Sequence, residues 1–103
     1  MTSRHYRRQR HKREKFIDEC LGGDGKVVDS FIVDKGHIKG LERHDVTENG
    51  IIVIYNAETN KLVTKLVARS GQIQRYYYNS GKEPPLWLLE LCEWHESLQY
   101  NRL

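Results

Sequence analysis

Residues 48–56 read ENGIIVIYN, and this stretch decides the fold. Asn49-Gly50 is a strong signal for a tight β-hairpin turn, because both residues tolerate the positive φ angles that such a turn requires. The six residues that follow, Ile51–Asn56, are mostly apolar and β-branched at consecutive positions. That pattern is typical of a strand covered on both faces. The sequence therefore predicts a central strand of an antiparallel sheet, covered at least in part on both sides.

The segments before this strand extend the same sheet. Residues 41–47, LERHDVT, form a weaker strand candidate that the Asn49-Gly50 turn joins to the central strand. Residues 26–34, KVVDSFIVD, are rich in β-branched and aromatic side chains, which favour a strand. We therefore expect hairpins between consecutive strands on this side.

The segments after the central strand continue the pattern. Residues 57–61 form a second turn, and residues 62–69, LVTKLVAR, then alternate between a mostly apolar face and a face with Lys65 and Arg69. Residues 72–78, QIQRYYY, favour a fourth or fifth strand because of their isoleucine and tyrosines. A helix there is the weaker alternative.

A helix is predicted at the N-terminal end of the chain. Residues 3–21 contain neither glycine nor proline and are followed by Gly22-Gly23, a common way for a helix to end. Their apolar side chains are confined to the last turns, around Phe16 and Ile17. Only this end is therefore expected to dock on a core.

A second helix is predicted at the C-terminal end. Pro84-Pro85 suits the first turn of a helix, and LWLLELCEWHESLQYN follows it. Large apolar residues recur at helical spacing in this stretch, and we expect them to pack on the sheet. They are Trp87, Leu91, Trp94 and Leu98.

These elements predict an α+β fold: an N-terminal basic helix, a four- to five-stranded antiparallel meander, and a C-terminal amphipathic helix packed on the sheet. A chain of 103 residues, of which 38% are apolar, has room for one core. We expect a basic arm at residues 1–15 and a single domain at residues 16–103.

The charge is concentrated in this arm. Residues 4–15 have a net charge of +6, whereas the rest of the chain has a net charge of −3. Clustered cations bind phosphates and release counterions, which gives salt-sensitive affinity for nucleic acid. An acidic protein surface and a merely solvated helix are the alternatives. The basic residues are Arg4, Arg7, Arg8, Arg10, Lys12, Arg13 and Lys15, interleaved with His5, Tyr6 and His11.

A second group could carry acid–base chemistry. Glu42 and His44 are two residues apart, so on a strand they share one face. Metal-independent RNA cleavage needs a base, an acid and cations that hold the phosphate. The candidate catalytic residues are His37, Glu42, His44, Lys65 and Arg69. Solvated or ion-paired side chains on an edge strand are the competing interpretation.

Aromatic residues form a third group. Tyr76 and Tyr78, if exposed beside Arg75, would stack on unpaired bases and bind phosphate, with Tyr77 in the core between them. The alternative is that these tyrosines cover the sheet beneath the C-terminal helix.

Four stretches carry a resemblance to a known family: GHIKGLERH (residues 36–44), NGIIVIYN (49–56), ETNKLVTKL (58–66) and ARSGQIQRYY (68–77). They resemble the small toxin-type ribonucleases grouped as barnase, EndoU, colicin and RelE relatives, in which an N-terminal helix precedes an antiparallel meander. In size and style the chain is also similar to small bacteriophage and mobile-element proteins. The tryptophan-rich C-terminal helix departs from the ribonuclease pattern and leaves open an inactive or repurposed domain. The resemblance places these residues in or near a site: His37, Glu42, His44, Thr64, Lys65, Arg69 and Arg75.

Other functional classes find little support. The sequence shows no phosphate-binding glycine loop and no known metal-ligand spacing, so we expect neither a cofactor nor a metal. Without a signal peptide or a long apolar run, a cytoplasmic protein without membrane contact is expected. Cys20 and Cys92 lack a CxxC spacing and favour two buried, reduced thiols.

The sequence leaves two main functional hypotheses. The first is a metal-independent endoribonuclease. The second is a non-catalytic binder, of the kind a phage would encode, that engages nucleic acid or a nucleic-acid-handling protein through its arm, with RNA favoured over DNA as the partner. A third possibility is an oligomeric protein that uses the helix with Trp87 and Trp94 as an interface. The sequence does not fix the oligomeric state.

Overall fold

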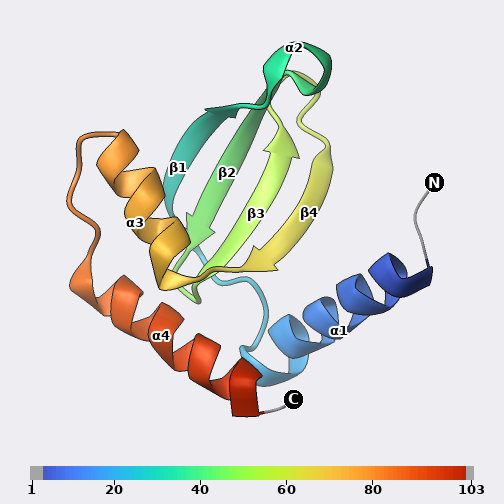
Figure 1. Ribbon diagram of the computed structural model, residues 1–103, viewed down its shortest axis with the longest axis vertical. Coiled ribbons are helices and arrows are strands. Elements are labelled where there is room, and N and C mark those ends of the chain that lie inside the picture. The colour runs from blue at the N-terminus through green and yellow to red at the C-terminus, as the bar shows by residue number, and fades with distance from the viewer. Residues whose placement is uncertain (1–3, 102–103) are drawn as a thin grey trace.

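The computed structural model describes the backbone of residues 4–101 and the side chains of residues 10–99. Within this range an antiparallel sheet has the strand order β1-β2-β3-β4, flanked by helices (Figure 1). The predicted α+β class is therefore confirmed. In chain order the elements are α1 (Arg4–Cys20), β1 (Val27–Asp34), α2 (Gly36–Lys39), β2 (Leu41–Thr47), β3 (Ile51–Asn56), β4 (Leu62–Val67), α3 (Ser70–Asn79) and α4 (Leu86–Asn101).

Strand β3 is covered on both faces, as its sequence predicts. One face of the sheet packs against α3 and α4, and we call it the α3/α4 face. Its core cluster consists of Phe31, Val46, Ile52, Ile54, Ala68, Ile73, Tyr77, Leu88 and Cys92. The other face, which we call the α1 face, packs against the end of α1. Its core cluster consists of Phe16, Ile17, Ile51, Val53 and Val67.

A tight turn joins β2 and β3 as predicted, but of the Asn49-Gly50 pair only Gly50 has the positive φ expected of both residues. The backbone N–H of Gly50 donates to the carbonyl of Thr47. The Thr47 hydroxyl accepts from the N–H of Ile51 at 3.1 Å. Gly50 has a φ of +74°, in the left-handed region that favours glycine. The β2–β3 hairpin therefore follows from local sequence chemistry.

Helix α1 docks by its C-terminal end, also as predicted. Phe16 is 6% exposed and Ile17 is 1% exposed, whereas Arg10, His11 and Lys12 are exposed. The helix is continuous from Arg4 to Cys20, so the expected boundary between arm and domain falls inside it. Within residues 4–101, no helix combines the length and the apolar character needed to cross a membrane.

The expected strand at residues 72–78 is wrong: this segment lies within helix α3. Its tyrosines favour a strand locally, but Ile73 and Tyr77, four residues apart, both enter the core of the α3/α4 face. The start of the helix is fixed by the Gln72 side chain, which accepts from the Arg69 N–H at 2.9 Å. Tertiary packing and this cap outweigh the β propensity.

The expected packing stripe on α4 is confirmed for Leu98, which packs against the core cluster of the α1 face, and is wrong for the two tryptophans. Trp87 and Trp94 are 49% and 61% exposed, while Leu88, Cys92 and His95 are buried. The two sets of residues are offset by one position, which turns the buried side of the helix by about 100°. The buried side chains Leu88, Cys92 and His95 are smaller than tryptophan, so α4 lies close to the sheet. A Cβ added to Gly50 would lie only 3.2 Å from the His95 ring.

Two further details differ from expectation. Cys92 is buried, but Cys20 is exposed at the end of α1, so the prediction of two buried thiols is half right. Residues 36–39 form the short helix α2, which the sequence pattern did not predict. The Gly36 N–H donates to the Asp34 carboxylate at 2.8 Å and stabilises the entry to this helix.

The buried His95 predicts a dependence of stability on pH. Burial lowers the pKa of His95 below its usual value of 6.5, and its Nδ1 has no hydrogen-bond partner among the described residues. Below pH 6.5 the unfolded chain binds a proton that the folded chain excludes, so the free energy of unfolding falls as the pH falls, until the lowered pKa is reached. The slope for one proton approaches about 1.4 kcal/mol per pH unit.

Denaturant titrations of the wild type and His95→Leu between about pH 7.5 and about pH 5 measure this effect. The difference in free energy of unfolding between the two proteins should change with pH in the direction given, with the wild type losing more stability in acid. A difference that is constant across this pH range would show that His95 does not titrate as described.

Candidate nucleic-acid interface

The basic residues of the arm lie in the first three turns of α1. Residues 4–15 span about 18 Å of helix at about 1.5 Å per residue. Arg10, His11, Lys12 and Lys15 are exposed, and Arg13 is half-buried. In Figure 1 this half of the helix extends away from the sheet. The side chains of Arg4, Arg7 and Arg8 lie outside the described residues, although their backbone is helical.

A pocket of about 260 Å³ lies between α1 and β4. It is lined by Arg10, Glu14, Ile17, Asp18, Leu62 and Lys65. Arg10 Nε is 3.3 Å from Glu14 Oε1. Lys65 Nζ lies 2.8 Å from Asp24 Oδ2, and this hydrogen bond raises the pKa of Lys65 above its usual value. Because Glu14 and Asp24 neutralise the charges of Arg10 and Lys65, the pocket has little net positive charge and attracts a phosphate only weakly.

Glu42 and His44 form the pair that their spacing on a strand predicts. His44 Nε2 lies 2.9 Å from Glu42 Oε1, and the side chains are 5% and 12% exposed. His44 Nδ1 is hydrogen-bonded to the Tyr76 hydroxyl. Burial, and then the charge of Glu42, raise the pKa of Tyr76 to about 12. The phenol therefore keeps its proton at neutral pH. The His44 tautomer sets the direction of both hydrogen bonds: where Nδ1 accepts from the phenol, the Nε2–H donates to Glu42.

This Glu42–His44–Tyr76 cluster is packed inside the α3/α4 face. The ring of Phe31 stacks on Tyr76 with centroids 5.3 Å apart. Phe31 is itself buried, and His44 is only 4% exposed as a whole residue. The cluster has the composition of an acid–base site, but a substrate hydroxyl has no open approach to the imidazole.

The remaining candidate catalytic residues do not join this cluster. His44 is paired with Ile54 across β2 and β3, whereas Lys65 is paired with Val53 across β3 and β4. Neighbouring residues of a strand face opposite sides. His44 therefore lies on the α3/α4 face and Lys65 on the α1 face, with the sheet between them.

The other two candidates lie elsewhere. His37 is exposed on α2, and Arg69 is exposed just before α3. Thr64 is paired with Ile54, so it shares the face of His44, and its buried hydroxyl has no hydrogen-bond partner among the described residues. The predicted catalytic set is therefore divided among separate parts of the fold.

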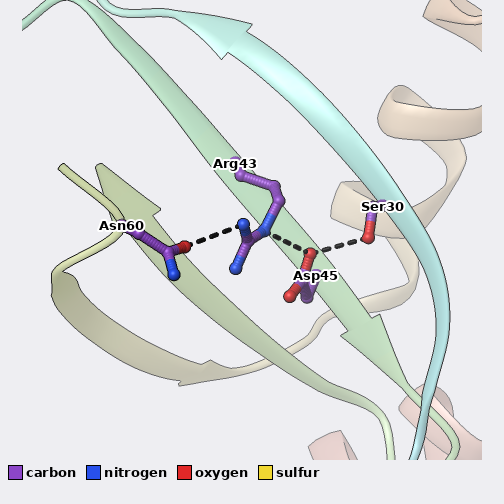
Figure 2. A network of polar contacts seen from close by, with 4 residues as sticks. All are labelled: Ser30, Arg43, Asp45 and Asn60. Carbon is purple, nitrogen blue, oxygen red and sulfur yellow. Dashed lines mark hydrogen bonds and ion pairs between the residues drawn. The ribbon is translucent and has the colours of Figure 1, made fainter. Parts of the chain in front are cut away.

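Sequence reasoning missed a polar network on the α1 face. Figure 2 shows Arg43 between Asp45 and Asn60, with Ser30 bonded to Asp45 in turn. Arg43 Nε donates to Asp45 at 3.1 Å, and its Nη1 donates to Asn60 at 2.9 Å. A signal for this network was present in the sequence. Because successive side chains of a strand point to opposite faces, Arg43 and Asp45 of β2 must lie on the face opposite Glu42 and His44.

Arg43 also lies over the ring of Tyr55, with the guanidinium carbon 4.5 Å from the ring centroid. This contact and the ion pair with Asp45 fix the arginine in place and neutralise much of its charge. The α1 face beside β2 is therefore an ordered polar surface and adds little attraction for a polyanion.

The three consecutive tyrosines take different positions on α3. Tyr77 is buried, as expected, and its hydroxyl donates to Asp29. Tyr76 is half-buried in the cluster with His44, so the exposed position that base stacking requires is not met at this residue. Tyr78 is 57% exposed, and Arg75, three residues before it, is exposed as well. Only this pair retains the geometry of a surface that could stack on a base.

Within the described residues, no cluster of three or more His, Cys, Asp or Glu side chains is arranged to hold a metal ion. Comparison of the chain with known protein families, with curated proteins and with solved structures finds no match. The resemblance to small ribonucleases thus stays a hypothesis that rests on the quoted residues.

Proposed function

We propose that the protein binds nucleic acid through the basic half of α1, without cleaving it, and that RNA is its preferred partner. The observation that carries the proposal is the docking of α1. Its C-terminal end packs on the sheet at Phe16 and Ile17, while the basic side chains described before that end, Arg10, Lys12 and Lys15, are exposed. A helix held at one end can place its cations against a phosphate backbone without disturbing the fold.

The contrast in charge supports this function. Residues 4–15 carry +6 and the rest of the chain carries −3, so a polyanion is attracted to the arm and repelled by the remainder. His5, Tyr6 and His11 stand among the cations. Such rings stack on unpaired bases, which the loops and ends of RNA offer more often than duplex DNA does. This interleaving favours RNA.

The position of the acid–base pair weighs towards binding rather than cleavage. A general base must reach the 2′-hydroxyl proton, and a cation must hold the same phosphate. The Glu42–His44 pair is buried, and Lys65 lies on the opposite face, where it pairs with Asp24. A cleavage mechanism would need these groups to move together.

The proposal is tested by fluorescence anisotropy with a labelled single-stranded RNA of about 20 nucleotides, the DNA of the same sequence, and polyglutamate. We expect micromolar or tighter binding of the RNA at low salt, weaker binding of the DNA, and little binding of polyglutamate. No binding of either nucleic acid at about 50 mM salt would overturn the proposal. Equal binding of polyglutamate would instead indicate an acidic protein surface as the partner.

The same mixtures, held in EDTA and run on a denaturing gel, separate binding from cleavage. The RNA should remain intact with the wild type. Cleavage by the wild type that is lost in both Glu42→Gln and His44→Ala would establish the endoribonuclease instead.

A further inference from the structure

Helix α4 presents an aromatic and acidic face to solvent. Trp87, Glu90 and Trp94 are three and four residues apart, so their side chains lie along one side of the helix. Trp87 is 49% exposed, Trp94 is 61% exposed, and Glu90 between them is exposed. They are the two tryptophans of the chain. Indole rings left in water at this spacing are typical of a surface that another molecule covers.

The charge of α4 indicates what could cover this face. The helix contains Glu90, Glu93 and Glu96 and no lysine or arginine. Of these, Glu90 and Glu93 are exposed, while Glu96 accepts the N–H of Ser70 at 3.1 Å. A carboxylate between two indoles binds a guanidinium well, because arginine stacks on the ring faces and pairs with the carboxylate at once. The expected occupant is therefore an arginine-rich helix.

Helix α1 of the same protein has this chemistry. Four of its first seven residues, Arg4, Arg7, Arg8 and Arg10, are arginines, and its backbone is helical from Arg4 onward. Within one molecule the two surfaces do not meet, because the basic half of α1 points away from α4 (Figure 1). A second copy can supply the missing half of the contact.

We propose that the outer face of α4, formed by Trp87, Glu90 and Trp94, binds the basic half of α1 from a second copy of the chain. Each copy carries both halves of the contact. In a dimer, α1 of each copy can therefore bind α4 of the other, and the two equal contacts close the assembly. Since RNA would occupy the same half of α1, RNA and the second copy compete. This competition rests on the proposed function, whereas the contact between copies does not.

Analytical ultracentrifugation of the full chain tests the contact. We expect a dimer at about 50 mM salt that dissociates towards monomer at about 500 mM, because ion pairs at the surface are screened. Intrinsic fluorescence gives a second readout: both tryptophans lie on this face, so emission should shift to the blue as the dimer forms. A monomer at high protein concentration in low salt would overturn the proposal.

Charge reversal supplies the specific test. Glu90→Lys should weaken the dimer at least tenfold, and the triple variant Arg4→Glu, Arg7→Glu, Arg8→Glu should do the same. Glu58→Lys is the matched control, because it makes the same charge change in the exposed β3–β4 turn. The substituted positions are exposed or lie in the extended half of α1, so the fold should be retained.

Mixing the two reversed proteins should restore a dimer, because the basic α1 of one then meets Glu90 and the acidic α1 of the other meets Lys at position 90. Failure of this rescue, or equal effects of Glu90→Lys and Glu58→Lys, would reject the contact. The RNA experiment is read separately. RNA that dissociates the dimer supports the competition, whereas a dimer that is unaffected by bound RNA contradicts the competition alone.

Discussion

Replacing Arg4, Arg7, Arg8 and Arg10 by glutamine is expected to weaken the binding of single-stranded RNA by about 10³- to 10⁴-fold at about 50 mM salt. Each phosphate contact on a single strand adds about 0.7 to the slope of log affinity against log salt concentration. Since about 50 mM is more than a decade below 1 M, each lost contact lowers the affinity by about one decade. Glutamine is a good helix former, so α1 should persist. Anisotropy titrations measure the affinity, and circular dichroism checks the helix.

The matched control replaces four lysines outside α1 by glutamine, which changes the net charge equally. These lysines are exposed on the loop before β1, just before α2, at the end of α2 and in the β3–β4 turn. They are Lys26, Lys35, Lys39 and Lys61. The control should bind RNA within a few-fold of the wild type. If both quadruple variants lose the same affinity, net charge rather than α1 governs binding, and the proposed interface is wrong.

The second large effect concerns the Glu42–His44–Tyr76 cluster. His44→Ala is expected to lower the free energy of unfolding by about 3 kcal/mol. The substitution removes the partner of a carboxylate that is 12% exposed and of a half-buried phenol. It also leaves a cavity beside Tyr76, whose ring centroid lies 5.5 Å from that of His44, and this adds to the loss. Urea denaturation followed by circular dichroism measures the change.

His37→Ala is the control for this prediction, because His37 is exposed on α2. Its effect on stability should stay within about 0.5 kcal/mol. RNA affinity at a temperature where both variants are folded should match that of the wild type. A stable His44→Ala protein would show that the cluster contributes little to the fold, and a folded variant that has lost RNA binding would place the nucleic-acid site on the α3/α4 face.

Local chemistry made much of the sheet predictable. The Asn49-Gly50 turn and the apolar run Ile51–Asn56 carry their own signals, and β3 lies where they indicate. Helix α3 was predicted as a strand because its tyrosines favour one, while the evidence for a helix is the contact of Ile73 and Tyr77 with distant parts of the chain. Such contacts are invisible to a local pattern.

The candidate site was predictable to a similar extent. The spacing of Glu42 and His44 placed both on one face of β2, and they are hydrogen-bonded. Their third partner, Tyr76, comes from α3, which the sequence did not reveal. Lys65 was expected to join them because alternation shows only which residues of one strand share a face. It does not show which residues of a neighbouring strand lie on that same face of the sheet. That relation depends on the register between β3 and β4.

The salt dependence of RNA binding tests the central claim most directly. Plots of log affinity against log salt concentration should be linear for the wild type, for the four-arginine variant of α1 and for the four-lysine control. The account predicts that the slope of the α1 variant is smaller in magnitude by about 3, close to 0.7 for each lost phosphate contact, while the control keeps the slope of the wild type. Equal slopes for the wild type and the α1 variant would contradict it.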